Sequence, residues 1–229
     1  MKSKILFAIA FVIVGFIALQ IPVNVLAGSR VKFTFFDLLA PISGAFLGSA
    51  FGIVSVLAVT VVNLALHGFS GVDKSSAVKL VATLRFLPLI FGTWAFAKKE
   101  GKLLIVPALA ILAFNLHPIG RTVWYYSLFW TIPFLMYPFR ERFLLARALS
   151  STFTAHAVGG AVWIWAFNLP APIWKSLIGV VVLERSVFAL GISAMYILSN
   201  NVLAILASKK LLPKSIKFDK KYNYFLRKA

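Results

Sequence analysis

The sequence predicts an all-α protein, a polytopic transmembrane helical bundle of six to eight membrane segments with both termini in the cytoplasm. Of its 229 residues, 61% are hydrophobic and only 13% are charged, against about 25% in an ordinary soluble domain. The net charge of +18 comes from cations that cluster where apolar segments end, which is the positive-inside pattern of membrane proteins. We therefore expect a multi-pass protein of the cell membrane and no nucleic-acid partner.

The expected helices follow the apolar segments of the chain. These lie at residues 5–27, 34–48, 51–67, 82–97, 103–117, 121–139, 148–168 and 176–206. We expect residues 1–207 to form the bundle and residues 208–229 to form a basic cytoplasmic tail. Residues 1–27 could alternatively be a signal peptide, but their apolar run is longer than a usual signal-peptide core, which favours a retained span.

The stretch from residue 33 to residue 67 is too long for one ordinary span, since a helix crosses a bilayer core in about 20 residues. Gly44, Gly48 and Gly52 recur at four-residue spacing within it. Glycines at this spacing allow close backbone approach and a tight reversal, although simple helix packing explains them equally well. We expect two short helices that turn near residues 48–52.

The positions of the basic clusters favour this two-helix arrangement. They occupy residues 98–102, 140–147 and 209–228. Two crossings within residues 33–67 put all three clusters on the side of the N-terminal lysines, which the positive-inside rule assigns to the cytoplasm. Residues 67–77 would then lie outside.

Polar and aromatic residues gather at the expected outer end, in the stretch "FNLHPIGRTVWYY" (residues 114–126). Aromatic rings beside a fixed cation can stack on and orient a planar or anionic solute. An interfacial aromatic belt with a snorkelling arginine accounts for the same residues equally well. The candidate binding residues here are Asn115, His117, Arg121, Trp124 and Tyr125, with Trp163 from the following segment.

Two further candidates, His156 and Glu184, lie inside apolar segments. A charge near the bilayer centre costs at least about 2.5–3.5 kcal/mol, so it is a functional-site hypothesis by default. A lone histidine in such a segment more often packs through a hydrogen bond than binds a ligand. Glu184 and Arg185 leave their helix about 100° apart, so we expect that they cannot simply face one another and that each needs a partner elsewhere. Arg121 could neutralise Glu184, and Asp37 could pair with Arg85 or Arg185.

Catalytic and metal-binding patterns are not recognisable in the sequence. The chain has no Cys, only three His and six acidic residues, and the histidines are not spaced as a metal pair. It also lacks paired carboxylates, a glycine-rich phosphate loop and a Ser-His-Asp arrangement. We expect no catalytic residue, metal or cofactor. The aromatic, lysine-rich tail predicts contact with anionic lipids.

The segment "RVKFTFFDLLAPISGAFLGSAFGIVSVLAVTVVNLALHG" resembles the early helices of the S components of energy-coupling factor (ECF) importers, with the riboflavin-type branch most similar. The resemblance rests on a basic, aromatic loop, an Asp-Leu helix start and glycines spaced by four. It covers about residues 5–102, including the next helix, "LRFLPLIFGTWAFAKKEGK". The residues that fit the pattern are Asp37, Gly44, Gly48, Gly52 and Asn63.

This resemblance implies a substrate-capturing subunit that takes up a small solute such as a vitamin. It also implies partners: a transmembrane coupling protein and paired cytosolic ATPases that supply the energy, so the chain itself is not an enzyme. One alternative is a membrane-embedded enzyme acting on a lipid-linked substrate, with His156, Glu184 and Arg121 as its functional groups. Another is a structural membrane subunit without a ligand.

Overall fold

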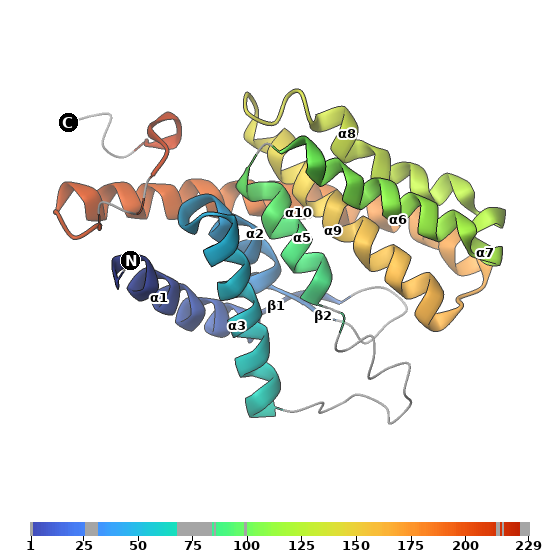
Figure 1. The fold of residues 1–229 in the computed structure, drawn as a ribbon, viewed down its shortest axis with the longest axis horizontal. Coiled ribbons are helices and arrows are strands. Elements are labelled where there is room, and N and C mark those ends of the chain that lie inside the picture. The colour runs from blue at the N-terminus through green and yellow to red at the C-terminus, as the bar shows by residue number, and fades with distance from the viewer. Residues whose placement is uncertain are drawn as a thin grey trace.

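The computed structural model describes residues 2–25, 32–67, 84, 86–98, 100–213, 216 and 218–224. Within these ranges the chain is all-α apart from one two-stranded hairpin (Figure 1). The longest helix, α10, runs along the bundle and packs mainly against α2 and α9. The α-helices are α1 (Lys2–Leu19), α2 (Phe35–Leu47), α3 (Ser49–His67), α5 (Phe86–Ala97), α6 (Ile105–Leu116), α7 (Pro118–Thr122), α8 (Ile132–Met136), α9 (Leu144–Phe167) and α10 (Ala171–Ser208).

The expected reversal between two short helices is confirmed, and it lies at Gly48 between α2 and α3. Gly48 has φ +86° and ψ 159°, a conformation that is essentially restricted to glycine. Close packing of the two helices is confirmed at Gly44 and Gly52, because a Cβ on Gly52 would lie 2.6 Å from the Gly44 Cα atom. At Gly48 itself a Cβ would meet nothing within 4 Å, so backbone conformation, not close approach, requires this glycine.

The first expected segment, residues 5–27, extends beyond the C-terminal end of the observed helix. Helix α1 ends at Leu19, and the chain continues into strand β1 (Pro22–Val25), because Pro22 has no N–H for a helical hydrogen bond. Strand β1 pairs antiparallel with β2 (Lys32–Thr34). Helix α1 packs on α2 and α3: a Cβ on Gly15 would lie 2.9 Å from side-chain atoms of both neighbours.

The prediction of one continuous segment at residues 121–139 is wrong. The chain instead forms the one-turn helix α7, a 3₁₀ helix (Trp124–Thr131) and the short helix α8. Pro118 and Pro133 each begin a new helical piece, since proline fits the first turn of a helix but not its interior. Gly120 lies directly against the backbone carbonyl of Phe114, which folds α7 back onto α6.

Helix α9 lies at the centre of the bundle and packs against α5, α6, α8 and α10. Its Ser150, Ser151, Thr152 and Thr154 side chains are buried. The Ser151 hydroxyl donates to the Gly92 carbonyl of α5 at 2.8 Å, and the Ser150 and Thr154 hydroxyls donate to carbonyls within α9. The polar content of α9 is therefore satisfied inside the bundle.

Two helical stretches, Ser49–Leu66 and Ala171–Ser208, are long and apolar enough to cross a membrane. The apolar helices at Lys4–Leu19, Phe35–Leu47, Phe86–Ala97 and Gly101–Leu116 are shorter. Helix α10 begins before the expected residue 176 and ends after residue 206. Its 38 residues span about 57 Å, nearly twice a bilayer core of about 30 Å.

The basic clusters meet at one end of the bundle. Arg140, between α8 and α9, donates to the Ala95 carbonyl, and Arg147 of α9 donates to the Phe96 carbonyl at 2.6 Å. Lys221 of the tail donates to the Arg142 carbonyl at 2.7 Å. Burial and the neighbouring Arg147 lower the pKa of Arg140 to about 10, which still leaves it charged at neutral pH.

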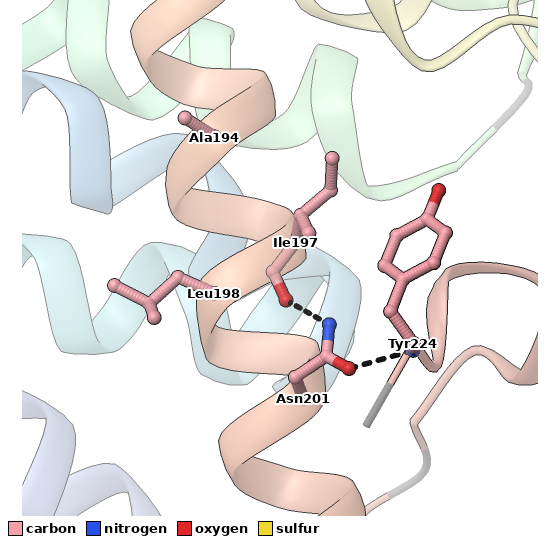
Figure 2. Close-up of a pocket in the computed structure, with 5 residues that line it drawn as sticks. All are labelled: Ala194, Ile197, Leu198, Asn201 and Tyr224. Atoms are coloured by element: carbon pink, nitrogen blue, oxygen red, sulfur yellow. Dashed lines mark hydrogen bonds between the residues drawn. The ribbon is translucent and has the colours of Figure 1, made fainter. Parts of the chain in front are cut away.

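The described part of the tail is fastened to α10 by two consecutive buried asparagines. The Asn200 side chain accepts from the Asp219 N–H at 2.6 Å and donates to the Asp219 carbonyl at 2.9 Å. The Asn201 side chain donates to the Tyr222 carbonyl at 2.9 Å. It also accepts from the Tyr224 N–H at 2.8 Å, as Figure 2 shows. This part of the tail is joined to the bundle rather than independent of it.

Candidate functional site

The candidate site is built around a buried ion pair on α10. Glu184 and Arg185 are each less than a tenth exposed, and Arg185 Nη2 lies 3.4 Å from Glu184 Oε2. The expectation that these neighbours cannot simply face one another is wrong. Their side chains are long enough to meet although they leave the helix in different directions. Arg185 Nη1 also lies 3.4 Å from the Thr152 hydroxyl of α9. Arg185 Nε is buried and has no hydrogen-bond acceptor among the described residues.

Aromatic side chains cover the Arg185 guanidinium. Its central carbon lies 4.5 Å from the Phe188 ring centroid and 5.2 Å from that of Phe33, and these two rings pack edge to face. Phe33 belongs to β2, so the hairpin between α1 and α2 reaches over the cation. Asp37, in the first turn of α2, lies within electrostatic range of Arg185, as the sequence suggested. Its carboxylate also accepts from the Thr34 N–H at 2.6 Å, which fixes the start of α2.

His156 lies beside the apolar core that surrounds Trp130, and both of its ring nitrogens have hydrogen-bond partners. The Trp130 indole N–H donates to His156 Nδ1 at 3.1 Å, and His156 Nε2 lies 3.3 Å from the Tyr126 hydroxyl. An indole nitrogen can only donate, so Nδ1 must be the acceptor and the neutral ring carries its proton on Nε2. This arrangement selects one tautomer of a neutral histidine.

Tyr126, the hydroxyl partner of His156, lies within electrostatic range of both Glu184 and Arg185. His156 with Tyr126 and Trp130, and Arg185 with Glu184 and Thr152, are therefore two buried polar groups within electrostatic range of each other. One apolar core is built on α2 and includes Phe36 and Ile192, and a second surrounds Trp130. The sequence indicated His156 and Glu184, but it gave no signal that Tyr126 contacts one and lies within electrostatic range of the other.

The residues predicted for the outer end do not join these two polar groups as one set. Asn115 donates to the Ser127 hydroxyl at 2.9 Å and so ties α6 to the 3₁₀ helix. His117 is buried, caps α7 by accepting from the Ile119 N–H, and packs edge to face on the ring of Trp165. Arg121 is exposed and donates to the Leu116 carbonyl at 3.2 Å.

The three predicted aromatic residues at this end also make local contacts. Trp124 is 56% exposed and packs edge to face on Tyr125, and Trp163 packs edge to face on Phe167. In the described part of the chain these six residues form a helix-end structure with ordinary capping and ring contacts. They line neither of two surface hollows that the structure contains.

One hollow, of about 330 Å³, lies on α10 beside Tyr224 and has an almost entirely apolar lining that includes Ile197 and Leu198 (Figure 2). The other, of about 410 Å³, lies at the basic end, next to the turn at Gly48. Among the described residues, no group of three or more His, Cys, Asp or Glu side chains is placed to hold a metal ion.

Comparison of the chain with protein-family models, with curated proteins and with solved structures finds no match. The function must therefore be argued from the residues and their geometry.

Proposed function

We propose that this chain is the substrate-capturing membrane subunit of an ECF-type, ATP-driven importer and that it binds a small solute at Arg185. The observation that carries the proposal is the buried Arg185 guanidinium, which has an unfilled Nε–H donor and lies beneath the β1–β2 hairpin. We expect a planar or anionic solute of about vitamin size.

The chemistry of the guanidinium supports solute binding. A buried donor without an acceptor costs about 1–3 kcal/mol, so a solute oxygen that accepts from Nε would recover this energy. Guanidinium donors suit carboxylates and planar oxygen-bearing rings because they bind in a fixed, forked geometry. Phe33 and Phe188 supply apolar ring surfaces at the same place. Glu184 balances the charge of Arg185 while the site is empty.

The cover over Arg185 supports reversible access. Phe33 lies on a two-stranded hairpin, and such hairpins are at best marginally stable by themselves. Displacing the hairpin therefore disrupts less packing than displacing any helix of the bundle. We infer that solute enters from the hairpin side, which is opposite the basic end in a multi-pass arrangement.

The convergence of the basic clusters supports a single cytoplasmic face, as the positive-inside rule requires. In the ECF pattern this chain would work with a transmembrane coupling protein and paired cytosolic ATPases. Solute capture without catalysis is consistent with a His156 ring whose two nitrogens are both engaged by neighbouring side chains.

The test is to identify the small molecules that the purified protein retains. The protein is extracted from its native membrane in mild detergent, washed, denatured in solvent and analysed by mass spectrometry. We expect one water-soluble organic molecule at close to one per chain. Retention of lipids and detergent alone would contradict solute capture, and retention of a lipid-linked sugar or phosphate would favour the membrane-enzyme alternative.

A further inference from the structure

The 410 Å³ hollow at the basic end has the properties of an anion site. Lys4 of α1, Lys98 after α5 and Lys102 of the following 3₁₀ helix line it together with Glu100. Glu100 pairs with Lys102 at 3.2 Å, so the four side chains carry a net charge of +2. Three separate elements therefore bring cations to one concave surface.

The floor of this hollow is the start of α3. The first amides of a helix have no carbonyl partner within the helix, and the residue before α3 is Gly48, which has no side chain to cap them. The Ser49 hydroxyl also lines the hollow, and it is buried with no hydrogen-bond partner among the described residues. A helix N-terminus and a free hydroxyl are groups that bind phosphate.

The surroundings of the hollow indicate a lipid phosphate rather than a free one. Leu6 of α1 is 67% exposed and Val54 of α3 is 61% exposed, and each lies within one helical turn of a lining residue. The hollow is also as large as pockets that hold small molecules, roughly 300–1,000 Å³, so it has room for a headgroup beyond its phosphate. Acyl chains could lie along the apolar faces of α1 and α3 while the headgroup occupies the hollow.

We propose that the hollow between Lys4, Ser49, Lys98 and Lys102 binds the phosphodiester headgroup of an anionic membrane lipid. Lysine ammonium groups neutralise the phosphate, the α3 N-terminus and the Ser49 hydroxyl donate hydrogen bonds to its oxygens, and Trp94 forms one wall. This site requires a membrane location but is independent of solute capture at Arg185.

The test is native mass spectrometry of the full chain titrated with short-chain phosphatidylglycerol and phosphatidylcholine. We expect the first phosphatidylglycerol to bind at least tenfold more tightly than phosphatidylcholine. The K4Q/K98Q/K102Q triple variant should lose at least tenfold in this affinity, and Ser49→Ala should lose severalfold. The matched control R121Q/R142Q/K175Q removes three exposed cations that lie outside both the hollow and the tail, and it should change the affinity less than twofold.

Two results would overturn the proposal. Equal loss in both triple variants would mean that phosphatidylglycerol responds only to overall charge. Glycerol phosphate, which has the phosphate but no acyl chains, should compete at least tenfold less well than phosphatidylglycerol. Equal competition would identify a site for a soluble phosphate ester instead of a lipid.

Discussion

The Trp130 indole N–H donates to His156 Nδ1 at 3.1 Å, which fixes the position and tautomer of a histidine beside the apolar core around Trp130. The same ring approaches the Tyr126 hydroxyl through its other nitrogen. The histidine therefore satisfies two aromatic side chains from the 3₁₀ helix and joins that helix to α9.

His156→Ala should destabilise the protein by about 2–4 kcal/mol, because it opens a cavity and leaves the Trp130 N–H without its acceptor. The midpoint of thermal unfolding in detergent measures the effect. His156→Gln, which can still accept from Trp130, should recover part of the loss. Equal melting of His156→Ala and wild type would show that this hydrogen bond does not support the fold.

The turn between α2 and α3 gives a prediction that separates strain from crowding. Gly48→Ala and Gly48→Leu should cost similar amounts, about 1–3 kcal/mol, because both suffer from φ +86° and a Cβ at this position meets nothing within 4 Å. At Gly52, Leu should be much worse than Ala, since even a Cβ overlaps the Gly44 backbone. Thermal melting of the four variants measures this contrast, and a steep rise from Ala to Leu at Gly48 would contradict it.

The absence of Cys makes the orientation testable with single cysteines. Arg121→Cys should react with a membrane-impermeant thiol reagent in intact cells, and Lys102→Cys should react only after lysis, if the basic end faces the cytoplasm as the positive-inside rule predicts. Both positions are exposed in the structure. The reverse pattern would invert the topology.

The expectation that residues 67–77 lie outside concerns a stretch of which only His67 is among the described residues.

The tail should separate from α10 when the hydrogen bonds of Asn200 are removed. Asn200→Ala deletes both hydrogen bonds to Asp219, so trypsin should cut after Lys220 and Lys221 faster than in wild type. Ser208→Ala, at an exposed position on the same helix end, is the control and should leave the rate unchanged. Unchanged cleavage in Asn200→Ala would show that these hydrogen bonds do not hold the tail against α10.

Hydrophobic segments and glycine spacing predicted most of the helices, because these features depend on local sequence. The same reasoning failed at residues 121–139, where prolines and the contact of Gly120 with Phe114 divide an apolar run into short pieces. Periodicity cannot reveal that contact, since it depends on how α7 folds back. The assignment of 208–229 as a separate tail likewise could not anticipate the pairing of Asn200 with Asp219.

The candidate site was only partly predictable. Burial of a charged pair is readable from Glu184 and Arg185 within an apolar run, but their partners depend on the packing of α9 and the hairpin. Thr152 and Phe33 lie 33 and 152 positions before Arg185 in the sequence, and no local pattern connects them. The polar and aromatic residues of 114–126, here called the outer aromatic cluster, looked like one site because they are close in sequence. The structure gives each predicted residue of the cluster a local partner instead.

The most direct test of solute capture at Arg185 is the amount of solute retained by two arginine variants, each checked for wild-type melting. Arg185→Lys keeps the charge but loses the forked donors, so retention should fall at least tenfold, which corresponds to about 1.4 kcal/mol. Arg121→Ala, at the exposed outer end, should retain as much solute as wild type. Full retention by a folded Arg185→Lys variant together with loss in Arg121→Ala would contradict solute binding at Arg185. It would indicate that the solute binds at the outer aromatic cluster instead.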